Sequence, residues 1–282
     1  MPELPEVETI KRRLNSLLTN KAIHSIKVLR DKSFQGDLNL VEQCSIVAVK
    51  RRAKILQFDL NNDHHLIIHL KMTGQLIFVD EKQKVGGGHP TADWVTQLPG
   101  KHTRVIFTFQ DDSKLFFNDM RVFGWIRLLK PLELAQEYAK YGPDIVDPAI
   151  TGDYLLEQFA RRSIPIKQAI MDNKILAGVG NIYASEALYL AGIHPQRPAK
   201  SLTEEEIAKL FKAMKQVINR GIELGGTTFD GKYVNVDGLA GGYQNEMKVY
   251  GMEGAKCVNC EGTVKRVKLG GRSTFFCENC QK

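Results

Sequence analysis

Four of the five cysteines lie after residue 256 and form two Cys-X-X-Cys pairs. Cys257 and Cys260 make the first pair, Cys277 and Cys280 make the second, and residues 261–276 separate them. Two knuckles with this spacing bring four thiolates to tetrahedral positions, the ligand set of a structural zinc ribbon. Because the protein supplies all four ligands, the metal keeps no open position for a substrate. We therefore expect one structural Zn²⁺.

Two disulfides are the alternative for the same four cysteines. Disulfides form in oxidising compartments. The N-terminal sequence MPELPEVE carries carboxylates where a secretory signal peptide has positive charge followed by an apolar stretch. The sequence therefore favours metal ligation.

Two β-like runs, VKRVKL and STFFC, join the cysteine pairs through Gly270-Gly271. A hairpin of this size buries too little apolar surface to fold alone, so the metal is expected to stabilise it. The hairpin also carries four basic side chains: Lys265, Arg266, Lys268 and Arg272.

The N-terminus is predicted to lead into a helix. Pro5 suits the first helical position because its missing N–H would be unpaired there, and Glu6 lies near the positive end of the helix dipole. The apolar residues recur at helical spacing, which anchors the helix to a core and fixes the residues before it: Val7, Ile10, Leu14, Leu17 and Leu18.

Between about residues 22 and 130 the pattern changes to short β-rich runs separated by turn signals. Seven such runs without long helices between them predict an antiparallel sandwich or barrel. Residues 82–101 lack a clear period and are predicted to form a long loop.

Beyond a turn-rich linker the period becomes helical. Thr203 and Glu206 form a capping box before a long apolar stripe, and three shorter helices are expected, at 153–162, 165–173 and 182–191. The glycine-rich residues 225–243 are predicted to be a loop. The chain thus divides into a sandwich domain (1–131), a linker (132–150), a helical domain (151–243) and a zinc finger (244–282).

Composition narrows the class of protein. The chain has 282 residues, 43% of them hydrophobic and 25% charged, which is typical of a globular protein. No run of 18 apolar residues exists, so no membrane span is expected. The formal net charge of +7 permits a nucleic-acid partner without requiring one.

Motifs along the whole chain resemble one family. MPELPEVET at the start, RRAK at 51–54, HLKMTG at 69–74, DMRVFG at 119–124, the block from 171 to 195 that contains GVGNIYASE, QNEMKVYG at 244–251 and the cysteine pairs occur in this order. Together they resemble bacterial formamidopyrimidine-DNA glycosylases, bifunctional enzymes that excise oxidised purines such as 8-oxoguanine. The resemblance implies an α+β fold: an antiparallel β-sandwich with a leading helix, then a helix–two-turn–helix domain and a zinc ribbon.

The resemblance assigns the chemistry to the N-terminus. Once Met1 is removed, the secondary amine of Pro2 is a free nucleophile that can attack C1′ of the damaged nucleotide, expel the base and form an iminium. Glu3 is expected to be the general acid and base. Glu6 matches another acidic position of the family, although a helix-dipole role explains it equally well.

Two basic residues match family positions with roles in strand cleavage. Lys54 of the RRAK motif is assigned there as a proton donor in β-elimination, and contact with a phosphate is an alternative role. Arg272 matches the arginine assigned to δ-elimination. Since a guanidinium does not give up its proton readily, we expect Arg272 to clamp a phosphate and stabilise charge.

Base extrusion leaves a hole in the duplex, and Met72, Arg121 and Phe123 match the wedge residues that fill it. Val122 stands where many relatives carry Arg or Lys. A further set of residues is expected to contact DNA phosphates, with Asn181 also capping its helix: His102, Arg162, Lys167 and Asn181.

Two other functions remain open at this point. An endonuclease VIII-like glycosylase for oxidised pyrimidines has the same architecture, and a non-catalytic zinc-ribbon protein would only bind DNA. The favoured function implies double-stranded DNA with oxidised purines or abasic sites as partner, no membrane, a monomer, and a bacterial cytoplasmic location at the nucleoid.

Overall fold

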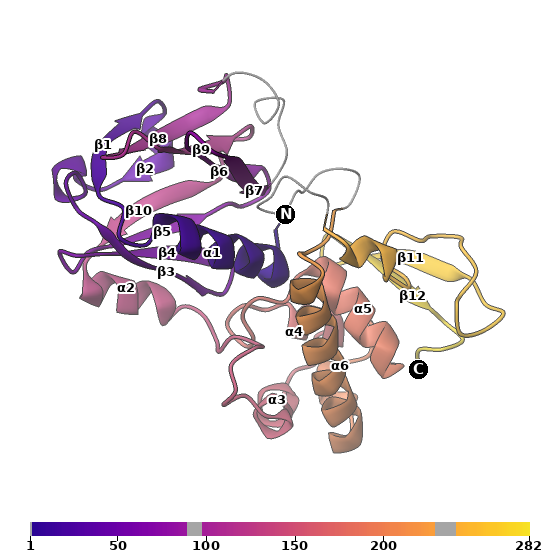
Figure 1. The fold of residues 1–282 in the computed structure, drawn as a ribbon. Helices are drawn as coiled ribbons and strands as arrows, with labels where there is room; N and C mark the ends of the chain where they lie inside the picture. The colour runs from indigo at the N-terminus through magenta and orange to yellow at the C-terminus, as the bar shows by residue number, and fades with distance from the viewer. Residues whose placement is uncertain (1, 89–97, 229–240) are drawn as a thin grey trace. The chain divides into compact units, whose positions relative to one another are not determined.

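The computed structural model describes residues 2–88, 98–228 and 241–282, and these divide into two compact units. The first unit comprises Met1–Ala139 and Leu224–Gln244, and the second comprises Lys140–Glu223 and Asn245–Lys282. Each is described below by itself (Figure 1). Within the described ranges, no helix is long and apolar enough to cross a membrane.

The first unit is a leading helix on a β-sandwich, as predicted. Helix α1 spans Leu4–Leu18 and packs along β3. Among the described residues of this unit, ten strands form two five-stranded sheets with the orders β1-β8-β9-β6-β7 and β2-β10-β5-β4-β3, antiparallel except for the β2–β10 pair. Their bounds are β1 Ile23–Val28, β2 Phe34–Gln35, β3 Ile46–Arg52, β4 Ile55–Leu60, β5 His65–His69, β6 Gly74–Val79, β7 Lys84–Gly88, β8 Thr103–Phe109, β9 Lys114–Asp119 and β10 Trp125–Leu129. Single turns of 3₁₀ helix lie at Asp31–Ser33 and Leu38–Leu40.

The core of this unit lies between the two sheets and α1. Alternate side chains of β9, Leu115 and Phe117, point into it together with Ile10 and Leu14 of the helix. Phe116, between them, faces the other side and packs with Ile77 and Ile106 in a second small cluster. Burial on both faces explains why β9 reads as a continuous apolar run rather than as an alternating one.

Two connections cross from one sheet to the other at the same end of the sandwich. One joins β5 to β6 and the other joins β9 to β10. Gly74 of β6 pairs with Asp119 of β9, and Trp125 of β10 pairs with His69 of β5. The loops between these residues, 70–73 and 120–124, are therefore neighbours.

Two segments differ from the sequence-based prediction. Within the predicted loop 82–101, Lys84–Gly88 forms strand β7 beside β6. Glycine has low strand propensity, but Gly88 has φ +121°, and a Cβ there would meet the Gly74 carbonyl oxygen at 2.4 Å. Close backbone approach explains the glycines. At the start of the predicted linker 132–150, Pro131–Tyr138 forms helix α2, which begins one residue before that linker.

The second unit contains the predicted helices and the hairpin. Helix α5 packs against α6, and α3 packs against α6 as well. The capping box at Thr203 and Glu206 is present, with both hydrogen bonds formed. The bounds are α3 Gly152–Phe159, α4 Ile166–Ile170, α5 Asn181–Ala191, α6 Glu204–Glu223, β11 Val264–Leu269 and β12 Arg272–Cys277, with a 3₁₀ turn at Ala199–Ser201. A further 3₁₀ turn, Tyr243–Asn245, includes the last residues of the first unit and the first residue of the following segment of the second.

Candidate functional site

The N-terminal residues of the first unit are buried and fixed by α1. Pro2 is buried, and Glu3 is only 3% exposed and is the N-cap residue of the helix. The Glu3 side chain accepts from the main chain of the first turn, and the Glu3 main-chain N–H donates to Glu6 Oε2 at 2.7 Å. A carboxylate is thus held directly beside Pro2 by the start of a helix.

The Glu6 carboxylate binds two main-chain N–H groups, one from Glu3 and one from a distant part of the chain. Its second oxygen, Oε1, accepts from the main-chain N–H of Thr227 at 2.8 Å. Thr227 belongs to the predicted glycine-rich loop 225–243, of which residues 229–240 lie outside the described residues. One side chain therefore connects the beginning of that loop to Glu3, and the sequence contained no signal for this contact.

Lys54 lies in the tight turn between β3 and β4 and is 8% exposed. Its charge acts on His69, whose pKa falls to about 3, chiefly because the ring is buried and also because Lys71 and Lys54 are close. The Lys71 main-chain N–H donates to His69 Nδ1 at 2.9 Å, so neutral His69 carries its proton on Nε2. His69 begins the HLKMTG motif but was not among the predicted site residues, and its Nε2–H is a potential donor close to Lys54.

The three predicted wedge residues come together on the neighbouring crossover loops. Met72 is 45% exposed and Phe123 is 51% exposed. The Arg121 guanidinium lies between them, with its Nη1 3.3 Å from the Met72 sulfur and its Cζ 4.6 Å from the centre of the Phe123 ring. The main chain of His102 lies beside the start of the loop that carries Arg121 and Phe123, since its carbonyl accepts from the Asp119 N–H at 2.9 Å. The result is an exposed stack of an apolar side chain, a cation and an aromatic ring.

In the second unit, two of the predicted phosphate contacts, Lys167 and Asn181, converge on strand β12. Lys167, 2% exposed, places its Nζ 3.0 Å from Thr274 Oγ1 and 3.3 Å from the Ser273 carbonyl. Asn181 Nδ2 donates to the same carbonyl at 2.9 Å. The prediction that Asn181 caps α5 is wrong, because Gly180 is the N-cap residue and Asn181 turns toward the hairpin instead.

Tyr250 was not singled out in the sequence, although it lies in the QNEMKVYG motif. Its hydroxyl is 3.4 Å from Asn181 Nδ2. The carboxylate of Glu186 on α5 holds the segment, because it accepts from the N–H groups of Lys248, Val249 and Tyr250 at 2.8–3.0 Å. Burial raises the pKa of Glu186, and these three hydrogen bonds oppose the rise.

Arg162 and Arg272 are the remaining predicted residues of this unit. Arg162 is partly buried, and its Nε donates to the Gln158 carbonyl at 2.9 Å. Arg272 is exposed at the first position of β12, after Gly270 and Gly271, whose φ values of +55° and +76° form the turn. Ser273, which Lys167 and Asn181 contact, follows Arg272 directly. The side chains of Lys167 and Asn181 therefore fix the main chain of β12 directly after Arg272.

The four cysteine sulfurs form a cluster with the dimensions of a zinc site. All four lie within 4.8 Å of one another, and three of the pairs are separated by 3.5, 3.5 and 3.7 Å. Tetrahedral Zn–S bonds of about 2.3 Å require S–S distances of about 3.8 Å. The Asn259 and Gly262 N–H groups point at Cys257 and Cys260 sulfurs at 3.4 Å, as suits thiolates. The residues fit one zinc ion.

Three family models match consecutive parts of the chain. The formamidopyrimidine-DNA glycosylase N-terminal domain matches residues 1–126, and the H2TH domain of the same enzymes matches residues 141–232. The zinc finger found in FPG and IleRS matches residues 254–282. The chain belongs to the formamidopyrimidine-DNA glycosylase family.

Relatives and solved structures of this family cover the whole chain. The formamidopyrimidine-DNA glycosylase of Rickettsia conorii is 40% identical over 286 residues, covering 100% of this chain and 99% of its own. A Lactococcus lactis FPG mutant in complex with a Fapy-dG containing DNA superimposes with a TM-score of 0.88 at 30% identity, covering 100% of both chains. The MutM (FPG) protein of Thermus thermophilus superimposes with a TM-score of 0.85 at 35% identity, covering 99% of this chain and 98% of its own.

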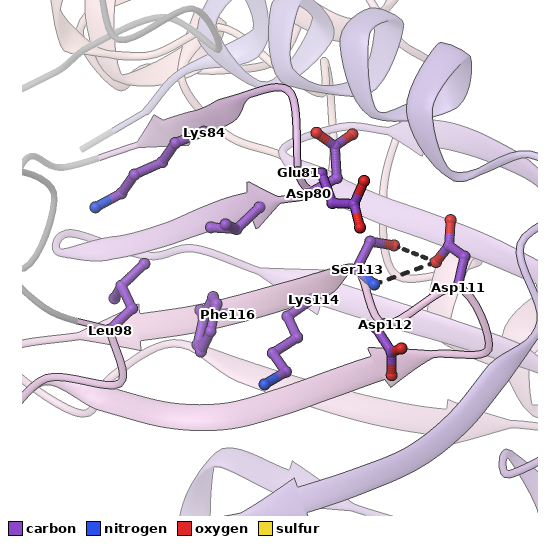
Figure 2. A pocket seen from close by; sticks show the side chains of 10 residues that line it. Asp80, Glu81, Lys84, Leu98, Asp111, Asp112, Ser113, Lys114 and Phe116 are labelled. Atoms are coloured by element: carbon purple, nitrogen blue, oxygen red, sulfur yellow. Dashed lines mark hydrogen bonds between the residues drawn. The ribbon is translucent and has the colours of Figure 1, made fainter.

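Figure 2 shows a pocket whose lining includes none of the candidate residues. Its walls include Phe116, Leu98 and Lys114. Lys114 pairs with Val79, at the end of β9 and β6 opposite to Asp119 and the wedge loops. The Asp111 carboxylate is engaged within its own turn, accepting from Ser113. The pocket is therefore not the candidate active site.

Proposed function

We propose that this chain is a DNA glycosylase and abasic-site lyase of base-excision repair that removes oxidised purines, such as 8-oxoguanine and formamidopyrimidines. The observation that carries the proposal is the arrangement of two groups of residues in the first unit. It holds a buried carboxylate, Glu3, directly beside Pro2, and it exposes a stack of Met72, Arg121 and Phe123. The first arrangement suits covalent chemistry at the terminus, and the second suits insertion into a duplex.

Chemistry begins when the free Pro2 nitrogen bonds to C1′ of the damaged nucleotide while Glu3 protonates O4′, so that the C1′–O4′ bond breaks and the sugar ring opens. The Pro2 nitrogen then gives up its proton and its lone pair expels the base, which carries that proton away and leaves an iminium between Pro2 and the sugar. An α-amino group titrates near about 8, so part of it is unprotonated at neutral pH. Pro2 acts only without Met1, because an acylated nitrogen has no nucleophilic lone pair.

Strand cleavage follows from the same iminium. Loss of a C2′ proton expels the 3′ phosphate in β-elimination, and a further elimination expels the 5′ phosphate before water releases Pro2. We assign Lys54 to proton transfer in the first step. Arg272 stabilises a phosphate in the second, because a guanidinium does not give up its proton readily.

Extrusion of the lesion depends on the stack of Met72, Arg121 and Phe123. The thioether and the phenyl ring replace the stacking that the flipped base provided, and the guanidinium hydrogen-bonds the cytosine left without a partner. His102, Arg162, Lys167 and Asn181 orient the DNA backbone. Lys167 does so by holding β12, since its Nζ is buried on Ser273 and Thr274.

Phe123→Ala is expected to slow excision of 8-oxoguanine paired with cytosine by roughly 10- to 100-fold, since stacking of a base on an aromatic ring is worth about 1–3 kcal/mol. The reduction in excision rate should be smaller when the lesion lies in a mismatch that opens easily. Single-turnover rates on both duplexes measure this. Leu132→Ala, which truncates an exposed apolar side chain on α2, is the control. Equal losses on both duplexes would contradict the wedge role.

Borohydride trapping tests the proposed function. Reduction of the iminium should link the protein to 8-oxoguanine duplex, and mass spectrometry should map the link to Pro2. A link mapped to a lysine would overturn the assignment. Preferential trapping on an oxidised-pyrimidine duplex would favour the endonuclease VIII-like alternative, and lesion binding without trapping would favour a non-catalytic binding protein.

We expect the enzyme to act as a monomer on nucleoid DNA in the bacterial cytoplasm. The net charge of +7 and pI near 9.1 support an anionic polymer as partner. Sedimentation with and without lesion duplex tests the stoichiometry. A dimer in either state would contradict this expectation.

A further inference from the structure

Asp119, the last residue of β9, is the buried acidic group nearest in sequence to the wedge. Its exposed fraction is 0%. Its main chain is engaged on both sides: the N–H donates to the His102 carbonyl at 2.9 Å, and its carbonyl accepts from Arg104 Nε at 2.8 Å. The backbone at the beginning of the wedge loop is therefore fixed to β8.

The Asp119 carboxylate spans the loop that follows it. Oδ1 accepts from the main-chain N–H of Arg121 at 3.1 Å, and Oδ2 accepts from the N–H of Gly124 at 2.6 Å. Arg121 and Phe123 thus lie between two main-chain groups that bind the same carboxylate. This arrangement sets the conformation of the segment that carries both side chains.

The same carboxylate reaches the other crossover loop. The Thr73 hydroxyl donates to Asp119 Oδ1 and accepts from the Arg121 N–H at 3.1 Å. Thr73 directly follows Met72, which contributes the third member of the stack. One buried carboxylate therefore connects both loops, although they join different pairs of strands.

The loop needs such a restraint because of Val122. Its φ is +55°, in the left-handed region, where a β-branched residue is an outlier. A backbone in this conformation persists only when its surroundings over-determine it. The Asp119 hydrogen bonds on either side of Val122 supply that restraint.

We propose that Asp119 is a positioning residue for lesion extrusion: it orders the Met72–Arg121–Phe123 stack before DNA binds. The inference rests on the proposed function. A wedge ordered in advance loses less conformational entropy when it enters the duplex. The step that depends on Asp119 is therefore unstacking and unpairing of the base, and chemistry at Pro2 and Glu3 is independent of it.

Asp119→Asn tests this with minimal change of shape. A carboxylate only accepts hydrogen bonds, whereas an amide keeps one accepting oxygen and turns an NH₂ toward the other donors. Whichever way the amide lies, its NH₂ faces either the Gly124 N–H or the Thr73 hydroxyl and Arg121 N–H, so the hydrogen bonds that Asp119 accepts on that side are lost. We expect single-turnover excision from an 8-oxoguanine·cytosine pair to slow roughly 10- to 100-fold. Nicking of a preformed abasic site, which has no base to unstack, should slow less than about threefold.

The control is Asp112→Asn, the same substitution in an exposed turn at the other end of β9, at φ +62° where asparagine is also tolerated. It should match wild type on both substrates. Equal slowing of excision and nicking by Asp119→Asn would overturn the proposal, as would wild-type excision by a folded variant. Wild-type protein that excises nothing would refute the proposed function itself.

A second pair of variants covers the case in which Asp119→Asn does not fold. Thr73→Val removes the hydroxyl that joins the loops, and Thr73→Ser keeps it. We expect the valine variant to slow excision selectively on the paired lesion and the serine variant to restore it. Indistinguishable rates for the two would contradict the role of this connection.

Discussion

Glu3→Gln is expected to slow base excision strongly while lesion binding persists. General acid–base groups contribute about 10²–10⁴-fold to rate, and the excision rate should fall within that range. Glutamine keeps the size of the side chain and an oxygen that can accept from the first turn of α1. The hydrogen bond from the Glu3 main chain to Glu6 is also unaffected, since it does not involve the Glu3 side chain.

Single-turnover excision and fluorescence anisotropy with lesion duplex measure the two properties separately. Glu81→Gln, the same change at an exposed turn, is the control and should behave as wild type. An excision rate near that of wild type for Glu3→Gln would contradict the assignment of Glu3 as the general acid. A parallel loss of lesion binding would instead indicate a disturbed N-terminus, which thermal unfolding would reveal.

The features that sequence predicts well are those with a short-range physical cause. The cysteine spacing predicts the sulfur cluster, because two knuckles dictate the ligand geometry. The capping box at Thr203 predicts where α6 begins, since both hydrogen bonds lie within one turn. The apolar spacing of Val7, Ile10 and Leu14 predicts the buried face of α1.

The features that sequence misses depend on residues far apart in the chain. Asp119 contacts Thr73 across 46 positions and Glu6 contacts Thr227 across 221, and neither contact has a local pattern. Strand β7 was missed because its glycines have low strand propensity, and pairing with β6 outweighs that preference. Asn181 was given a local role as a cap, but its amide bonds to the distant Ser273 carbonyl.

The stack of Met72, Arg121 and Phe123 also depends on residues far apart in the chain. The sequence identified Met72, Arg121 and Phe123 only through their resemblance to family motifs. A core position for Phe123 was otherwise a reasonable interpretation, because aromatic rings are usually buried. Its exposure, together with the guanidinium 4.6 Å from its ring, is the structural observation that favours a role in binding.

Removal of zinc is expected to unfold the hairpin of β11 and β12 and to abolish DNA binding. A two-stranded hairpin is marginally stable at best in water, and its apolar cluster here is small. Zinc contributes about 10–16 kcal/mol to the folding of zinc-finger peptides at neutral pH, far more than such a cluster supplies. Without the metal, the hairpin loses the geometry that presents Arg272.

Cys257→Ser and chelation should both unfold the hairpin and abolish DNA binding. We expect one zinc per chain in the untreated wild type, and none in the variant or in the chelated protein. Elemental analysis, hydrogen exchange of β12 and anisotropy with lesion duplex measure metal content, folding and binding. Cys44→Ser should change none of them, since Cys44 lies in the other unit. Metal-free protein that binds lesion DNA as tightly as wild type would contradict the structural role. Loss of binding in Arg272→Ala with zinc retained would show that the hairpin acts through this arginine, because the fold is then intact and only the guanidinium is missing.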